Sequence, residues 1–262
     1  MKLEVLVTTM HQTGIEKYSQ MNIQTDVVIA NQCGENPYFE TIVNDNIIKL
    51  VSTATIGLSR NRNIALAHSN QRVDFILFSD DDLVFNDGYA DLVIKGFEAH
   101  PRADAIKFNL HDLSSTRKLG MKYIQKFEKA TKRNMMASGI CGLVIRRSSL
   151  EKSNLHFRED FGAGTDIYSG EDSIFLIEMF RKKVQLYRSP IDIAGIDQSE
   201  STWFKGIDRK YFEVKGIVIK SLYPHLCYLL IIRSAYRAYR RGDSGMSFFQ
   251  ILSYYYSGIK KR

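Results

Sequence analysis

One stretch of ten residues limits what this chain can fold into. Residues 73–82 read VDFILFSDDD, an apolar and aromatic run that ends in three consecutive acids. The apolar part is too short for a buried helix and is rich in β-prone residues, which predicts a central strand buried on both faces. Because side chains alternate along a strand, Asp80 and Asp82 should point to one side and Asp81 to the other. Such a pair of carboxylates can bind one hard divalent cation, and the alternative is a solvated acidic turn.

Strands and helices are predicted to alternate over the first 200 residues. Expected strands lie near residues 4–10, 25–31, 47–52, 75–78, 103–109, 139–146 and 184–187. Expected helices lie near residues 12–20, 57–68, 86–100, 114–134 and 171–183. This order predicts an α/β domain with a mainly parallel sheet, in which ligands bind beyond the carboxyl ends of the strands. The three acids lie at such an end, which favours a functional site over a simple turn.

The helix predicted from residue 57 has a glycine-led start. Ser59 is a plausible N-cap there, and Ile64 and Ala67 are expected to pack inward. The segment 114–134 is strongly basic, and we interpret it as a helix with a solvated charged face.

Two acids open the helix predicted at residues 171–183. Glu171 and Asp172 follow a loop rich in glycine, which suggests a backbone shaped for close approach to a ligand. The alternative is structural, because the helix dipole alone favours acids in a first turn. Ser169 and Asp172 also have the spacing of an N-terminal capping box.

The net charge of +7 belongs to the C-terminal part of the chain. Residues 211–262 hold nine Lys and Arg and two acids, whereas the other 210 residues have 27 of each sign. A neutral main domain argues against a nucleic-acid groove. Three scattered cysteines without a CxxC pair fit a reduced, cytoplasmic compartment and no thiolate metal site. The N-terminus enters a strand without the apolar region of a signal peptide.

Residues 211–262 also carry 11 of the 30 aromatic residues. An apolar stretch at 217–232 is interrupted by Lys220, Pro224 and His225, which argues against a helix that spans a membrane. Arginines at 233, 237, 240 and 241 then share one helix face with tyrosines beside them. Basic aromatic helices of this kind lie on anionic membrane surfaces, and packing on the domain or on a second subunit of a homo-oligomer is the alternative. We therefore predict a domain at 1–210 and a helical appendage at 211–262.

The order of these pieces over about residues 1–206 resembles the family 2 glycosyltransferases with the GT-A fold. The likeness rests on the opening strand and on the segment 59–61 (SRN), which is like the family's Ala/Ser-Arg-Asn. It also rests on residues 78–82 (FSDDD), which are like its DxD-ending strand, and on residues 170–172 (GED), which are like its Glu-Asp motif. Each motif is weak alone, and their order and spacing make the resemblance specific.

The resemblance implies a nucleotide-sugar donor held through a metal. Asp80 would lie nearer the ribose and Asp82 nearer Mn²⁺ or Mg²⁺ on the diphosphate, with Asp81 the less certain middle residue. Arg60 would lie near the base or the phosphates; its alternative is a surface arginine at a helix start. Further donor contacts are expected from Thr8, Asn31 and Trp203. The sequence departs from the family at Asn31-Gln32, where acids often contact the base, and at Asp197-Gln198, where many relatives have a metal-binding His.

The Glu-Asp motif implies a general base that takes the proton from an acceptor hydroxyl. Asp172 is favoured and Glu171 is second. The expected reaction is a single displacement with inversion, from a UDP-linked sugar to a glycan or lipid-linked acceptor, as in bacterial surface-polysaccharide synthesis at the inner face of the plasma membrane. A nucleotidyltransferase is disfavoured because no Gly-rich, Lys-bearing loop follows the first strand. A non-catalytic sugar- or membrane-binding protein on the same fold is the third hypothesis.

Overall fold

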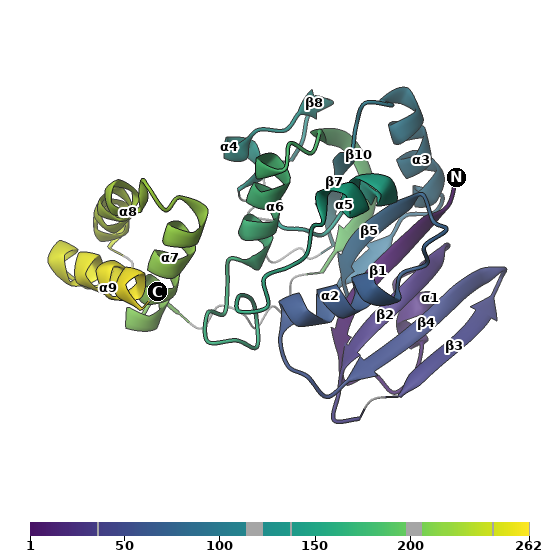
Figure 1. Ribbon diagram of the computed structural model, residues 1–262, viewed down its shortest axis with the longest axis horizontal. Coiled ribbons are helices and arrows are strands. Elements are labelled where there is room, and N and C mark those ends of the chain that lie inside the picture. Colours follow the sequence, from purple (N-terminus) through teal and green to yellow (C-terminus); the bar gives the residue numbers. More distant parts are fainter. Residues whose placement is uncertain (36, 114–122, 137, 198–205, 243, 262) are drawn as a thin grey trace.

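The computed structural model describes residues 1–35, 37–113, 123–136, 138–197, 206–242 and 244–261 (Figure 1). Its strands are β1 (Leu3–Met10), β2 (Asp26–Gln32), β3 (Tyr38–Val43), β4 (Asn46–Thr53), β5 (Phe75–Asp80), β6 (Leu83–Phe85), β7 (Ala105–Asp112), β8 (Glu128–Lys129), β9 (Leu143–Arg146) and β10 (Leu186–Ile196). Its helices are α1 (Glu16–Gln20), α2 (Leu58–His68), α3 (Tyr89–Ala99), α4 (Lys132–Met135), α5 (Arg147–Ser153), α6 (Glu171–Arg181), α7 (Arg209–Leu222), α8 (Cys227–Arg241) and α9 (Phe248–Lys260).

The strands form one mixed sheet in the order β3-β4-β2-β1-β5-β9-β7-β10-β6, with β8 paired to β10. Strands β4, β2, β1 and β5 run parallel, as do β7 and β10. The predicted α/β fold is confirmed, and the mainly parallel arrangement holds for the half of the sheet that carries Asp80. In the other half, β9 runs antiparallel between β5 and β7. It begins at the carboxyl edge, where the Gly142 N–H donates to the Phe78 carbonyl.

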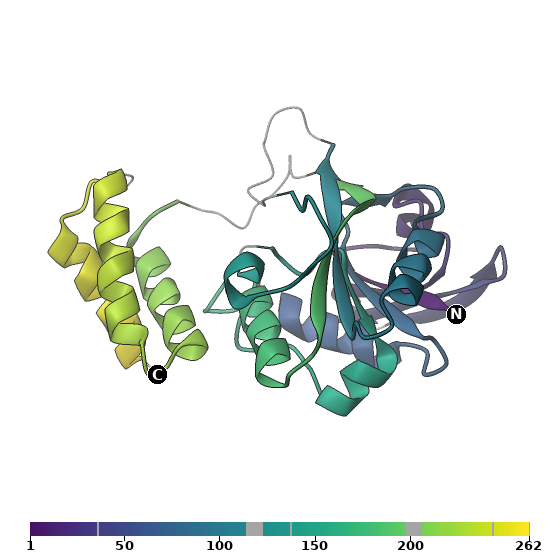
Figure 2. The same ribbon diagram turned by 90° about the horizontal axis from the view of Figure 1, so that it is seen from above.

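Strand β5 lies at the centre of the core, as predicted. Phe75, Ile76 and Leu77 are fully buried. Phe75 stacks on Phe97 of α3 with ring centroids 4.4 Å apart, and Phe78 meets Phe175 of α6 edge-on at 5.7 Å. These two contacts lie on opposite faces, and Figure 2 shows α3 on one side of the sheet and α6 on the other. Full burial explains why the first four residues of this strand are all apolar.

The helix predicted at 114–134 is wrong over the part that the structure describes; residues 114–122 lie outside it. Residues 123–136 contain β8 and the short helix α4 instead. Strand β8 pairs with β10, and Glu128 forms a 2.7 Å ion pair with Arg188. The Asn109 side chain also binds the backbone of Ile124 through both its oxygen and its nitrogen. These tertiary contacts outweigh the local helix propensity.

Two predicted N-caps are also wrong. The N-cap of α2 is Gly57, with φ 132°, while the Ser59 hydroxyl donates to the Phe161 carbonyl at 2.7 Å. The N-cap of α6 is Gly170, with φ 102° and no side-chain cap, so Ser169 forms no capping box. In both helices a glycine in a backbone conformation that L-residues rarely adopt turns the chain into the first helical turn.

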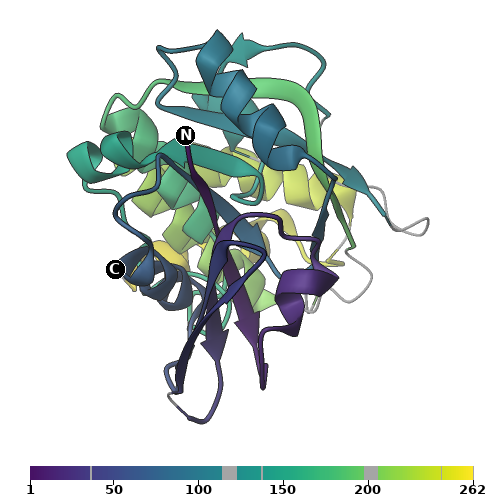
Figure 3. The same ribbon diagram turned by 90° about the vertical axis from the view of Figure 1, so that its right-hand side faces the viewer.

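Helices α7, α8 and α9 form a separate bundle that packs on α6 through α7; Figure 3 places it behind the sheet. Arg181 of α6 donates to the Leu222 carbonyl at the end of α7 at 2.8 Å. Helices α7 and α9 approach each other closely at Gly216 and Gly258, each of which faces a backbone carbonyl of the other helix. A methyl group at either position would overlap that carbonyl oxygen, so the close approach requires glycine at both. Within the described residues, no helix combines the length and apolarity needed to cross a membrane.

Candidate functional site

The acids after β5 lie at the carboxyl edge of the parallel half of the sheet. The register between β1 and β5 places Thr8 beside Asp80, and the Thr8 hydroxyl donates to Asp80 Oδ1 at 2.9 Å. Asp81 points to the opposite face, where it accepts a 2.5 Å hydrogen bond from Thr9 and lies 3.9 Å from Lys17 Nζ. The predicted alternation between Asp80 and Asp81 is confirmed, because the pleat continues to the end of the strand.

A buried arginine joins the acidic strand to the start of α6. Arg62 is only 3% exposed, and its two terminal nitrogens lie 2.9 Å from Asp80 Oδ1 and 2.5 Å from Asp172 Oδ1. Its guanidinium also lies 5.2 Å from the centroid of the Phe157 ring. Two acids 92 positions apart in the sequence are thus held by one cation.

Charge pairing outweighs burial in this group. Burial opposes the charge of Arg62, but Asp172 and Asp80 raise its pKa well above the usual value. Burial likewise acts to raise the pKa of Asp80, yet the charge and hydrogen bonds of Arg62 bring that pKa below its usual value. Asp80 is therefore ionised at neutral pH, and it is paired before any ligand binds.

The inward face of α2 explains why Arg62 occupies this position. Ser59, Arg62 and Ala65 are buried at a spacing of three residues, whereas the predicted inward residue Ala67 is exposed. Arg60 points outward and pairs with Glu159 at 3.0 Å, with the side chains 44% and 45% exposed. Arg60 of the segment 59–61 therefore does not contact Asp80 or Asp172. Arg62, two positions later, contacts both.

A turn at residues 138–142 contacts both acids that Arg62 holds. The Ile140 N–H donates to Asp172 Oδ2 at 3.0 Å, and the Cys141 thiol hydrogen-bonds Asp80 and lowers its pKa. The ammonium of Lys107 on β7 donates to the Cys141 carbonyl, and burial lowers its pKa to about 8. The backbone of this turn thus fixes one oxygen of Asp172 while Arg62 fixes the other.

Glu171 has a different environment from its neighbour Asp172. Its Oε2 is buried and finds no hydrogen-bond partner among the described residues. Burial, followed by the charge of Asp172, raises the pKa of Glu171 to about 7. Asp172 is instead held by the Arg62 cation at Oδ1 and by the Ile140 N–H at Oδ2. The two acids that the sequence grouped together are therefore separated by their surroundings.

Asp82 has the oxygen best suited to a cation. Its Oδ1 is buried without a partner in the described part of the chain, and burial together with Asp80 and Asp81 raises its pKa to about 7. The Asp197 N–H donates to the Asp82 carbonyl at 3.0 Å, which brings the end of β10 to this acid. A bound divalent cation would satisfy the orphaned oxygen and neutralise the crowded charges.

The protein ligands alone do not complete a metal site. The described residues contain no group of three or more His, Cys, Asp or Glu arranged to hold a metal ion. Both oxygens of Asp80 already accept hydrogen bonds from Arg62. The residues therefore fit a cation that takes one carboxylate from Asp82 and further oxygens from a phosphate-bearing ligand and water.

Two other predicted donor contacts differ in their placement. Asn31 is fully buried, and its amide binds the backbone of Gln12 through both atoms and the hydroxyl of Ser52. A contact from Asn31 to a base would require it to give up these bonds. Trp203 lies outside the described residues.

Sequence reasoning missed Arg62, Lys107 and the 138–142 turn. Arg62 was detectable, because Ser59, Arg62 and Ala65 repeat at a helical spacing that also fits an inward face. Nothing local marks Lys107, a charged residue within a β-prone run, or the N–H of Ile140. Their roles depend on contacts between strands that are distant in sequence.

The sheet order and the acids at the carboxyl edge and at the start of α6 are those of an α/β fold of the GT-A type. A model of the Glycosyl transferase family 2 matches residues 24–153, about half of the chain. The chain belongs to this family. No curated protein is significantly similar to it in sequence.

Solved structures of Staphylococcus aureus TarS share the fold. TarS 1-349 in complex with UDP-GlcNAc is 16% identical with a TM-score of 0.63, covering 84% of this chain and 66% of that one. The complex of TarS 1-349 with UDP is 13% identical with a TM-score of 0.62, covering 100% and 92%. TarS itself is 14% identical with a TM-score of 0.64, covering 98% and 55%. The present chain thus spans about two thirds of the first structure and about half of TarS.

The buried Glu171 predicts an unusual dependence of stability on pH. Its pKa is raised from 4.5 to about 7 in the folded chain, so folding disfavours its ionised form. The resulting destabilisation is absent below pH 4.5, grows as pH rises, and is complete above pH 7. Glu171→Gln should therefore stabilise the protein at pH 8, by up to about 3 kcal/mol, and have little effect at pH 4.5. Urea unfolding at the two pH values measures this difference.

Glu159→Gln is the matched control. Arg60 and Asn63 lower the pKa of Glu159 through hydrogen bonds, so this substitution should lower stability at pH 8, by no more than about 1 kcal/mol at this exposed pair. An equal gain from Glu171→Gln at both pH values would show that the pKa of Glu171 is not raised in the folded chain.

Proposed function

We propose that the protein is an inverting, metal-dependent glycosyltransferase that moves a sugar from a UDP-linked donor to a hydroxyl of a glycan or lipid-linked acceptor, in polysaccharide synthesis at the cytoplasmic face of a membrane. The observation that carries the proposal is the pairing of Asp80 and Asp172 with Arg62 at one edge of the sheet, with Asp82 close to Asp80. The complexes of TarS with UDP-GlcNAc and with UDP support the choice of nucleotide.

Asp172 is proposed as the general base. Arg62 and the Ile140 N–H fix its orientation, so an oxygen can accept the proton of the acceptor hydroxyl as that hydroxyl attacks the anomeric carbon. The attack would displace the nucleoside diphosphate in one step and invert the configuration, with no enzyme nucleophile. Glu171 is buried and partly protonated near neutral pH, which makes it the weaker candidate.

Asp82 is proposed as the protein's main ligand to Mn²⁺ or Mg²⁺. When bound, the cation would neutralise charge that develops on the diphosphate leaving group. Asp80 is proposed to contact the donor ribose, while Thr8 and Arg62 keep its carboxylate oriented. Asp81 faces away with Thr9 and Lys17, so its proposed part is to hold the end of β5 against β1 and α1.

A donor-turnover assay tests the proposal. We expect release of UDP from one or more UDP-sugars in the presence of Mn²⁺ and its loss on chelation. Asp82→Asn should reduce turnover by about 10²-fold or more and weaken Mn²⁺-dependent UDP binding, because it removes the charge that holds the cation. Asp87→Asn is the control, since Asp87 lies on the surface beside Asn22 and Gln24.

The alternative reactions give different results in the same assay. A nucleotidyltransferase would release pyrophosphate from a nucleoside triphosphate and leave UDP-sugars intact. A non-catalytic binding protein would bind a nucleotide sugar without turnover. Either result, or UDP binding that is unchanged in Asp82→Asn, would contradict the proposal.

A further inference from the structure

Helix α8 presents three distinct faces, and among the described residues only one of them is covered. Successive residues are about 100° apart around a helix. On that projection Cys227, Ile231, Ala235 and Ala238 occupy an arc of about 80°. All four are buried against the neighbouring helices. This buried face attaches α8 to the bundle and leaves about three quarters of its circumference outside.

The second face of α8 is apolar and exposed. It spans about 100° of the projection and consists of Tyr228, Leu229, Ile232, Tyr236 and Tyr239. Their side chains are 54%, 69%, 48%, 54% and 49% exposed. We call this set the apolar face. Exposed large apolar residues are ordinary when scattered, but a contiguous row on one helix marks an interaction surface.

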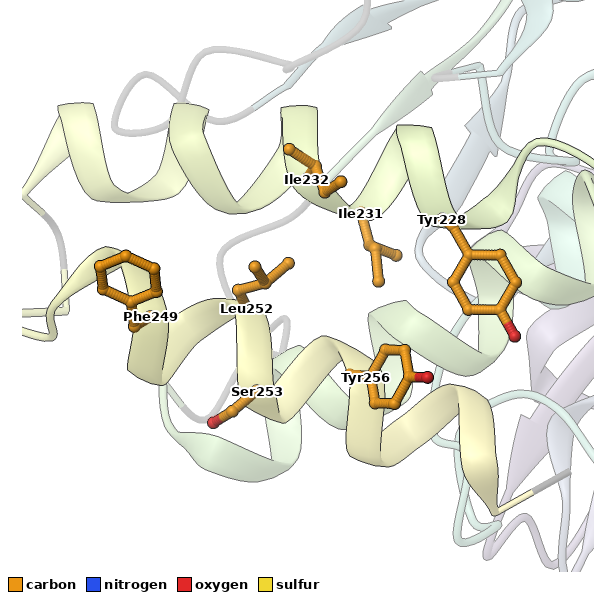
Figure 4. A pocket seen from close by; sticks show the side chains of 7 residues that line it. All are labelled: Tyr228, Ile231, Ile232, Phe249, Leu252, Ser253 and Tyr256. Atoms are coloured by element: carbon orange, nitrogen blue, oxygen red, sulfur yellow. The ribbon is translucent and has the colours of Figure 1, made fainter.

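Helix α9 extends the apolar face across a groove. Figure 4 shows Ile232 and Tyr228 of α8 opposite Phe249 and Tyr256 of α9, with Leu252 between them. The groove has a volume of ≈ 350 Å³, and Phe249 at its rim is 77% exposed. Figure 1 shows α7 between the sheet domain and these two helices, so the apolar face is not covered by the sheet.

The third face of α8 is basic. Arg233, Arg237, Arg240 and Arg241 fall within the next arc of about 100° and are all exposed. Neither α8 nor α9 contains an acidic residue. The surface therefore combines a row of aromatic and aliphatic side chains with an adjoining row of four cations.

The charge pattern of α8 and α9 indicates which kind of partner would bind this surface. In a two-fold dimer the same surface lies on both subunits, so these helices would bring like charges together without an acid of their own to pair with them. An anionic lipid surface provides apolar chains for the apolar face and phosphates for the arginines. Tyrosines suit the boundary between the two, because one end of the ring is apolar and the other is polar.

We propose that α8 and α9 dock the protein on an anionic lipid bilayer, with the apolar face and Phe249 at the boundary between headgroups and acyl chains and the four arginines on lipid phosphates. This inference rests on the proposed function, because a lipid-linked acceptor would be presented at a membrane. It adds the surface through which the protein would bind that membrane.

Co-sedimentation of the full chain with vesicles tests the docking surface. Binding is expected to phosphatidylcholine vesicles that contain phosphatidylglycerol, and to fall with rising salt. Arg233→Gln/Arg237→Gln should weaken binding about 25-fold, since each basic residue near such a surface contributes about fivefold. Ile232→Ser/Phe249→Ser should weaken it as well, whereas Phe39→Ser/Ile42→Ser removes equally exposed apolar residues from β3 and should not.

A second measurement does not depend on serine variants that could misfold. Phe249→Trp should show a blue shift of fluorescence on anionic vesicles that Phe39→Trp lacks. Equal binding to vesicles without phosphatidylglycerol, no vesicle binding, or a dimer in solution that Ile232→Ser/Phe249→Ser dissociates would each overturn the proposal. UDP release from a soluble donor, measured without vesicles, separates these outcomes from failure of the proposed function.

Discussion

Replacing Arg62 by methionine should lower the free energy of unfolding by about 3 kcal/mol and reduce donor turnover by at least about 10²-fold. The substitution keeps much of the side-chain volume but removes the cation between Asp80 and Asp172, which are then left near each other without compensation. Thermal unfolding should occur roughly 6–12 °C lower. Circular dichroism and UDP release measure the two effects on the same samples.

Arg60→Met is the matched control for this prediction. Arg60 lies on the same helix but pairs with Glu159 at the surface, where an ion pair contributes at most about 1 kcal/mol. A double-mutant cycle sharpens the comparison. Arg62→Met should lower the free energy of unfolding less in an Asp172→Asn background, because Asp80 is then the only one of the two carboxylates that loses its cation. Equal effects of Arg60→Met and Arg62→Met would contradict the proposed role of Arg62.

Asp172→Asn should reduce the rate constant for turnover by about 10²–10⁴-fold while leaving UDP binding nearly unchanged. The amide retains the shape of the carboxylate and can still accept the hydrogen bond from Ile140, but it cannot take a proton. Single-turnover rates of UDP release and calorimetric titration with UDP separate the chemical step from binding. Asparagine also loses the ion pair with Arg62, so the assay temperature must lie below the lowered unfolding transition.

Glu171→Gln distinguishes the two members of the acidic pair. It should reduce turnover less than tenfold, because the buried Oε2 of Glu171 has no hydrogen-bond partner among the described residues, whereas Arg62 and the Ile140 N–H orient Asp172. A loss of activity in Glu171→Gln together with an active Asp172→Asn would assign the base to Glu171 and refute the mechanism proposed above.

The local part of the fold was predictable where one signal dominated. The strand at 75–80, the glycine-led helix from 58 and the apolar helix from 171 each appear close to their expected bounds. Over its described residues, the segment 114–134 differs from the predicted helix because a run of basic residues does not fix a helical backbone. The contacts of Asn109 and the pairing of β8 with β10 fix a different one.

The site was predictable as a set of acids but not as an arrangement. Neighbouring residues are enough to place Asp80 and Asp81 at the end of a buried strand and Glu171 and Asp172 at the start of a helix. Tertiary packing is needed to bring Arg62, rather than Arg60, between Asp80 and Asp172, and to bury Glu171 while Asp172 is paired. Those outcomes depend on which face of α2 meets the sheet edge, and that is set by packing between segments about 100 residues apart.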